Sequence, residues 1–147
     1  CYRFTKDPAY LKQSEGIADF FLNLPNMPED FVPYWDMKAP GVDGLQSHVA
    51  VDSVPRDASA AALIASGLYE LCTYITPEKG KRYKSIADKI VGNLGRHYQA
   101  EPGTHYGFLL LHSTGHYPGG SEIDVPLNYA DYFYLEALAR KEALDNQ

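Results

Sequence analysis

The sequence has few cysteines, fewer basic than acidic residues and no long hydrophobic run, and each shortage excludes a class of protein. Cys1 and Cys72 are the only cysteines and lack CxxC spacing, so we expect no disulfide framework. Lys and Arg number 13 against 19 Asp and Glu, and this net charge of −6 argues against binding to nucleic acid or to a membrane surface. The longest apolar runs, such as Ala58–Tyr69, are too short to span a membrane. Because the chain opens on Cys1 and not on Met, the lack of a visible signal peptide leaves the localisation open.

Aromatic side chains are abundant by contrast, with 12 Tyr, 6 Phe and 1 Trp among 147 residues. Proteins that bind sugars use such side chains as stacking platforms, although hydrophobic cores use them as well. The length fits one domain, and the hydrophobic content of 45% is enough for a substantial core.

Four segments have the apolar spacing and the start and stop signals of helices. The first and second begin at Asp7 and Asp57, which are good N-cap residues, and the first has Pro8 at its first helical position. The expected ranges are about 7–24, 57–74, 77–100 and 128–143. The sequence therefore predicts an all-α protein.

The four predicted helices form two copies of one helical-hairpin unit. In the first and third, apolar residues recur at +7, +8 and +11 from Tyr10 and from Tyr83, which lie 73 residues apart, and charge occupies the remaining face. This pattern is typical of an outer, half-exposed helix. The second and fourth are apolar on most sides and each contains one Glu, Glu70 or Glu136, which we expect to be paired with a neighbouring helix.

The connections between these helices differ in length. The link from 75 to 80 is short, whereas the links 25–56 and 101–127 are long and rich in Gly, Pro and aromatic residues. Because the helix direction alternates, both long links should emerge at the same end, beside the start of the inner helices. Hairpins stacked in a ring form a toroid with its pocket at that end, and two units would be about a third of a ring of six.

Three strings of residues resemble a known family. These are Val32-Pro33-Tyr34-Trp35-Asp36, the segment 55–62 that contains Arg56-Asp57-Ala58-Ser59-Ala60, and the segment 129–138 that begins Tyr129-Ala130-Asp131. In this order and spacing they resemble the C-terminal portion of glycoside hydrolase family 88, the unsaturated glucuronyl hydrolases. The related unsaturated rhamnogalacturonyl hydrolases of family 105 tend to carry Glu-Thr in place of the Arg-Asp pair, so family 88 is the preferred interpretation.

The resemblance implies that residues 1–147 are the C-terminal fragment of a single (α/α)6 catalytic domain. It also implies a reaction without metal or organic cofactor on an unsaturated uronyl oligosaccharide. An Asp protonates the C4=C5 double bond of the terminal uronic acid, water adds at C5, and the hemiketal opens to release the sugar. The family's catalytic Asp pair lies upstream of the matched region, so we expect no catalytic residue in this chain and no activity from it alone.

Candidate substrate-binding residues cluster at the predicted pocket end. Trp35 is either a wall against the sugar or a plug that anchors its loop, and Asp57 and Ser59 are helix caps that can also line the pocket. Asp131 is interpreted as a cap or a hydrogen-bonding partner within the barrel. The candidates are Trp35, Asp57, Ser59, His112, Ser113, His116 and Tyr129.

Two other functions remain open from the sequence: a helical-repeat module that binds a protein, and a non-catalytic carbohydrate-binding remnant of such a barrel. A third of a ring would also leave apolar faces of its inner helices uncovered. We therefore expect these helices to pack against the missing part of the barrel or against another copy of the chain.

Overall fold

The computed structural model describes residues 1–38 and 54–146, and this part of the chain contains helices and isolated β-bridges. The predicted all-α class is confirmed. Helix ends agree with the expected ranges to within two or three residues, except that the third helix passes into a π-helical turn, Leu94–Tyr98, and the short first helix is not predicted. The α-helices are α1 (Tyr2–Thr5), α2 (Pro8–Leu22), α3 (Ala58–Leu71), α4 (Pro77–Asn93) and α5 (Asn128–Asp145).

Local signals account for the helix starts. Asp7 and Asp57 cap α2 and α3, and their carboxylates accept hydrogen bonds from the backbone amides of Ala9 and Ser59, respectively. Proline occupies the first position of both α2 and α4. The tight turn between α3 and α4 depends on Gly80, because a Cβ atom there would lie 2.7 Å from the carbonyl oxygen of Cys72.

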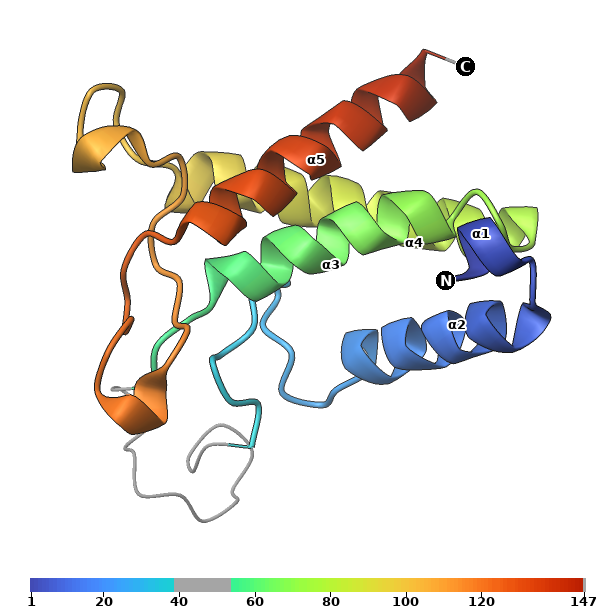
Figure 1. Ribbon diagram of the computed structural model, residues 1–147, viewed down its shortest axis with the longest axis horizontal. Helices are drawn as coiled ribbons and strands as arrows, with labels where there is room; N and C mark the ends of the chain where they lie inside the picture. The colour runs from blue at the N-terminus through green and yellow to red at the C-terminus, as the bar shows by residue number, and fades with distance from the viewer. Residues whose placement is uncertain (39–53, 147) are drawn as a thin grey trace.

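The described parts of the two long connections lie at one end of the molecule and the short turn lies at the other (Figure 1). α3 and α5 both begin at the end with the long connections, and α2 and α4 both run towards it (Figure 1). This arrangement confirms the predicted alternation of helix direction. Residues 39–53 of the first connection lie outside the described residues.

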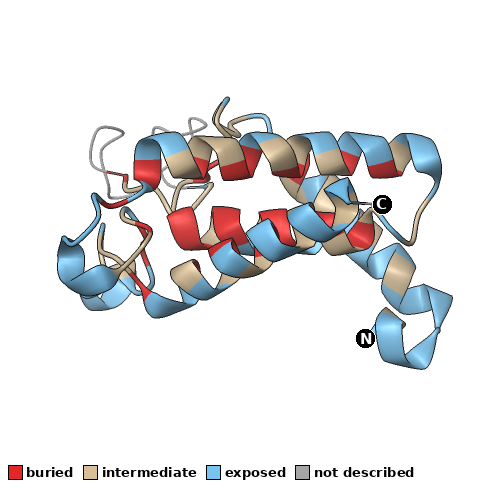
Figure 2. Ribbon diagram, turned by 90° about the horizontal axis from the view of Figure 1, so that it is seen from above, coloured by how far each residue is buried: buried red, intermediate tan, exposed pale blue. Residues whose placement is uncertain are grey.

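The core lies between α3, α4 and α5, where the buried residues concentrate, whereas α1 and α2 are mostly exposed (Figure 2). α3 packs against α5 along one side and α4 along another. The predicted apolar face of the third helix is confirmed, because Tyr83, Ala87 and Ile90 of α4 and Leu94 of the π-helical turn have no exposed surface and Val91 is buried. Burying such a side chain contributes about 1.5–3 kcal/mol, so α4 is firmly attached to α3.

The two glutamates inside the apolar helices are paired, as the sequence predicts. Arg140 of α5 contacts Glu70 of α3 at 2.9 Å and Glu136 of its own helix at 3.1 Å. The same guanidinium donates to the backbone oxygen of Ser66 at 2.7 Å, and the Ser66 hydroxyl donates to Glu136. A second arginine, Arg3 of α1, donates from Nε to Glu70 at 2.9 Å. Because α3 and α5 pack closely here, these polar groups must satisfy one another.

Candidate functional site

The candidate site lies at the N-terminal ends of α3 and α5, where the two long connections meet (Figure 1). Two backbone hydrogen bonds hold the beginning of the first connection against its end, just before α3. Trp35 N–H donates to Pro55 O at 3.0 Å, and Asp57 N–H donates to Pro33 O at 2.9 Å. The second connection reaches the same point, since Ala58 N–H donates to His112 O at 3.0 Å. Segments 33–35, 55–58 and 112–114 are therefore side by side.

Asp57 holds this junction together. Its Oδ1 atom accepts hydrogen bonds from the Ser59 backbone amide at 3.0 Å, from the Ser59 hydroxyl at 2.6 Å and from the Thr114 amide at 3.4 Å. The cap interpretation of Asp57 is confirmed. Because Ala58 N–H and Ser59 N–H, the first amides of α3, already donate within the protein, a bound carboxylate would have to interact with the helix dipole and with side chains.

Thr114 joins the two connections and is a residue that the sequence interpretation did not single out. Its hydroxyl donates to Arg56 O at 3.1 Å and accepts from the Asp124 amide at 3.2 Å, and the residue is only 6% exposed. A threonine inside a polar, glycine-rich loop gives no local signal for this role, because its partners lie 58 residues before it and 10 residues after it.

Tyr129, in the first turn of α5, faces the same junction. The pKa of its hydroxyl is raised by burial and then by the nearby carboxylates of Asp57 and Glu122, and the neighbouring Ser59 side chain opposes this rise. Gly115 provides the necessary space: a Cβ atom there would lie 2.4 Å from Glu122 Oε2 and 2.7 Å from the Tyr129 hydroxyl oxygen. The predicted residues Asp57, Ser59 and Tyr129 thus come together, and Glu122 joins them as a further unpredicted member.

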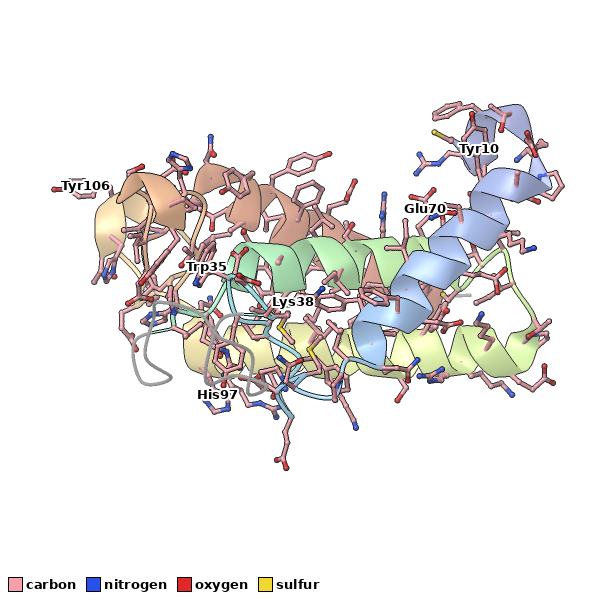
Figure 3. The ribbon with its side chains drawn as sticks, turned by 90° about the horizontal axis from the view of Figure 1, so that it is seen from below. Tyr10, Trp35, Lys38, Glu70, His97 and Tyr106 are labelled. Carbon is pink, nitrogen blue, oxygen red and sulfur yellow. The ribbon has the colours of Figure 1, made fainter. Side chains whose placement is uncertain are left out.

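Trp35 links the two connections through its ring. It stacks on Tyr117 with ring centroids 4.5 Å apart and an interplanar angle of 16°. Figure 3 shows Trp35 beside the beginning of α3. Its Nε1 atom is buried and has no hydrogen-bond partner among the described residues. One face of the indole therefore anchors the loop, as the plug interpretation requires, and its role as a wall against the sugar stays a prediction.

The remaining candidates, His112, Ser113 and His116, have different environments. His112 is exposed, and its Nδ1 atom lies 2.8 Å from Asp124 Oδ1. His116 is also exposed and packs over Gly119, where a Cβ atom would lie 2.1 Å from its Nε2 atom. Ser113 is fully buried, with no partner for its hydroxyl among residues 1–38 and 54–146. This burial argues against direct contact between Ser113 and a ligand.

Partly buried polar side chains support the site from behind. Arg56 forms an ion pair with Asp30 and donates from Nε to Val32 O at 2.9 Å. The Tyr98 hydroxyl donates to Asp30 at 2.8 Å, and burial together with this carboxylate raises the Tyr98 pKa. Asp131 accepts hydrogen bonds from the amides of residues 109 and 110, both at 2.9 Å. The predicted role of Asp131 as a hydrogen-bonding partner is confirmed.

Chemically, the site offers hydroxyl groups, carboxylates, imidazoles and an aromatic pair, which are the groups that proteins use to bind sugars. Among the described residues no group of three or more His, Cys, Asp or Glu side chains could hold a metal ion. No helix in the described part of the chain is long and apolar enough to cross a membrane.

Helical hairpins that alternate in direction, with both long connections at one end, define a segment of an (α/α)6 barrel. No protein-family model matches the chain. It is 40% identical over 144 residues to the unsaturated glucuronyl hydrolase of Formosa agariphila, a match that covers 97% of this chain and 33% of that protein. The resemblance to unsaturated glucuronyl hydrolases is therefore confirmed along nearly the whole chain, and the chain spans about a third of the length of the curated relatives it matches.

Two solved structures agree with this relationship. The crystal structure of an unsaturated glucuronyl hydrolase specific for heparin superposes with a TM-score of 0.88 at 42% identity, covering 99% of this chain and 37% of the other. A variant of the enzyme from Streptococcus agalactiae, crystallised with the disaccharide dGlcA-GalNAc6S, gives a TM-score of 0.78 at 30% identity and covers 95% and 34% of the two chains.

Proposed function

We propose that this chain forms part of a glycoside hydrolase that removes 4,5-unsaturated uronic acid from the oligosaccharides left by polysaccharide lyases. The observation that carries the proposal is the similarity to unsaturated glucuronyl hydrolases over 97% of the chain, together with a TM-score of 0.88 to one of them. In this proposal residues 1–147 are the C-terminal fragment of one catalytic (α/α)6 domain, and they pack against the rest of that domain or against another copy.

The proposed reaction is the addition of water to a vinyl ether. A carboxylic acid gives its proton to C4 of the unsaturated uronate, and the water molecule gives its hydroxyl to C5 and returns a proton to a base. The hemiketal formed at C5 then opens and the sugar is released. No bond at the anomeric carbon is displaced directly, so the two-carboxylate mechanism of ordinary glycosidases does not apply. The acid and base belong to a part of the enzyme that the matched motifs do not include.

The contribution of this chain would be to bind and orient the substrate. The hydroxyls of Tyr129 and Ser59 and the carboxylate of Asp57 converge at the start of α3, and the positive end of that helix favours the negative charge of a uronate. Trp35 would supply an aromatic surface, with Tyr117 holding its ring in place. His112 and His116, both exposed on the second connection, would contact the adjoining sugar.

The first experiment tests the division of labour. The purified 147-residue chain should not consume an unsaturated uronyl disaccharide, measured as loss of the ultraviolet absorbance of the double bond, whereas the full-length enzyme should. Turnover by the isolated chain that persists through further purification would contradict the assignment of the catalytic residues to another part of the enzyme. Failure of the full-length enzyme on uronyl substrates, with activity on an unsaturated rhamnogalacturonyl disaccharide, would favour the family 105 alternative.

The second experiment tests the site in the full-length enzyme. Tyr129→Phe removes one hydroxyl and should raise KM about tenfold, because one hydrogen bond to a charged group contributes roughly 1.5 kcal/mol. Tyr132→Phe is the control, since this tyrosine lies in the same helix, is 60% exposed, and its hydroxyl donates to Glu136 at 3.5 Å and not to the residues of the junction. Equal effects of the two substitutions would remove Tyr129 from the proposed site.

A further inference from the structure

Arg56 precedes the site residue Asp57 in the chain, but its side chain bonds to the beginning of the first connection. The guanidinium forms an ion pair with Asp30, donates from Nε to Val32 O at 2.9 Å, and lies 5.1 Å from the centre of the Tyr34 ring. Only 26% of the side chain is exposed, so these interactions are partly shielded from water. They fix the backbone at residue 56 and therefore the start of the residue that follows.

Asp30 attaches this arginine to the end of the third helix. Its Oδ1 atom accepts hydrogen bonds from Arg56 and, at 3.0 Å, from the Val32 amide. Its Oδ2 atom accepts from the hydroxyl of Tyr98 at 2.8 Å, and its backbone oxygen accepts from the Asn93 side chain at 3.0 Å. Hydrogen bonds to a charged carboxylate are roughly twice as strong as neutral ones. Asp30, Arg56 and Tyr98 therefore form one unit, which we call the Asp30 cluster.

One path of contacts leads from the Asp30 cluster to Asp57. The backbone oxygen of Arg56 accepts from the Thr114 hydroxyl at 3.1 Å, and the next residue, Asp57, accepts from the Thr114 amide at 3.4 Å. The same Asp57 oxygen binds the hydroxyl of Ser59. A displacement of Arg56 would therefore move the carboxylate of Asp57 relative to the second connection.

A second path leads from the cluster to His112. Tyr98 belongs to the π-helical turn after α4, and such turns occur frequently at functional sites. Its backbone oxygen accepts from the Leu111 amide at 2.8 Å, and its ring packs edge-on against His112 with centroids 6.0 Å apart. His112 has a left-handed backbone with φ of 61°, a conformation that persists in a non-glycine residue only where neighbouring contacts hold it. Tyr98 supplies such contacts, and Ala58 N–H supplies another.

We propose that Asp30, Arg56 and Tyr98 are positioning residues for the reaction, which hold the two connections at the separation that lets Asp57 and His112 contact one substrate together. The cluster acts through these two residues. A displacement of about 1 Å in a binding group can cost a large factor in rate, so the loss of one bond in the cluster should be measurable at the site. The inference deepens the proposed function and rests on it for the activity measurement.

The test uses the full-length enzyme and compares Tyr98→Phe with Tyr69→Phe. Tyr69 is a matched control, because it is 1% exposed and its hydroxyl also donates to an aspartate, Asp88, at 2.8 Å. Tyr69 lies in the last turn of α3, and Figure 3 shows the next residue, Glu70, at the opposite end of that helix from Trp35.

Both substitutions remove one buried hydrogen bond, so they should lower the thermal midpoint by similar amounts. Only Tyr98→Phe should lower kcat/KM for an unsaturated uronyl disaccharide, by about tenfold and mainly through KM, because it displaces binding groups. Equal values of kcat/KM for the two variants overturn the proposal.

Two further comparisons separate positioning from a general loss of stability. Arg56→Lys keeps the charge that pairs with Asp30 but loses the planar fork, so it should recover part of the kcat/KM that Arg56→Met loses. Tyr98→Phe added to Asp30→Asn should lower kcat/KM little beyond Asp30→Asn alone, because both remove the same hydrogen bond. Lysine no better than methionine, or additive effects of the other pair, contradict a cluster that acts as one unit.

Hydrogen exchange tests the cluster without turnover. Tyr98→Phe should speed exchange of the Ala58 and Leu111 amides, which tie the second connection to α3 and to Tyr98, by at least about fivefold, and Tyr69→Phe should not. Faster exchange in Tyr98→Phe alone supports the inference even if the full-length enzyme is inactive on the uronyl disaccharide, and that inactivity counts against the proposed function only. Unchanged exchange overturns the inference. If Tyr98→Phe does not fold, Asp30→Asn takes its place.

Discussion

The inner helices α3 and α5 begin at the same end of the molecule, and Arg140 of α5 contacts glutamates of both, yet their environments differ. Nine of the 14 residues of α3 are buried, against three of the 18 residues of α5. α3 consists mainly of alanine, serine and leucine and lies between α4 and α5, whereas α5 exposes Tyr132 and Leu135. This exposure of apolar positions on the second inner helix agrees with what the sequence predicts for part of a ring. The burial of an inner helix depends on the helices on both of its sides, and its own sequence is not sufficient to bury it.

The largest expected effect tests this comparison directly with two leucines. Leu68 of α3 is 2% exposed and Leu135 of α5 is 53% exposed. Leu68→Ala should lower the free energy of unfolding by about 2–5 kcal/mol, because it removes buried methyl groups and leaves a cavity. Leu135→Ala should change it by less than about 0.5 kcal/mol. Urea denaturation of both variants checks the prediction, and similar losses would mean that α5 is covered in solution.

The next effect concerns the contact between the two helices. Arg140→Met removes the guanidinium that bonds to Ser66, Glu136 and Glu70. We expect a loss of about 1–3 kcal/mol, because the carboxylates and the serine lose their partner in a partly buried place. Arg96→Met is a suitable control, since Arg96 is exposed and bonds only to Asn93 at 3.3 Å among the described residues. An equal response of the two variants in urea would contradict a specific role for Arg140.

A smaller effect is expected at the helix starts. Asp57 caps α3 through its side chain, whereas the described residues give α5 no side-chain cap. Asp57→Ala should cost about 1 kcal/mol of stability, and Asp57→Asn should retain most of it because the amide oxygen can still accept from Ser59 N–H. Circular dichroism during urea denaturation measures both. If Asp57→Asn is as damaging as Asp57→Ala, the hydrogen bonds are not what stabilises the start of α3.

The smallest effect is a dependence of stability on pH. The hydrogen bond from Arg3 and the charge of Arg140 lower the pKa of Glu70 below its ordinary value of 4.5, although burial opposes this shift. A lowered pKa in the folded state stabilises the protein above the ordinary pKa, and this stability is lost as the pH falls through the folded-state pKa. Arg3→Met should therefore flatten the loss of stability below pH 4.5. The measurement is the urea midpoint as a function of pH. If the midpoint of Arg3→Met falls in acid as steeply as that of the unsubstituted chain, this linkage is contradicted.

Much of the fold could be predicted because its signals are local. Asp7 and Asp57 mark helix starts through bonds to amides two residues away, and the apolar face of α4 follows from spacing within one helix. The candidate site was predicted in part for the same reason, since Asp57 and Tyr129 each lie at a recognisable helix start. Thr114 and Glu122 were missed because their partners come from distant segments, and nothing in a Gly-rich loop indicates which side chain will meet them.

The sequence by itself determined the helices, their alternating directions, the gathering of both long connections at one end, and the resemblance to unsaturated glucuronyl hydrolases. Caps, periodicity and motifs act over a few residues, so they can be read without coordinates. Only the tertiary structure decided that Tyr83 and Ile90 of α4 are buried while Tyr10 and Ile17, which have the same spacing in α2, are exposed, and that Arg140 joins Glu70 to Glu136. Burial and ion pairing depend on which helix lies alongside. The partners of Arg140 on α3 are about 70 residues away in the chain, and such distant neighbours leave no local signal in the sequence.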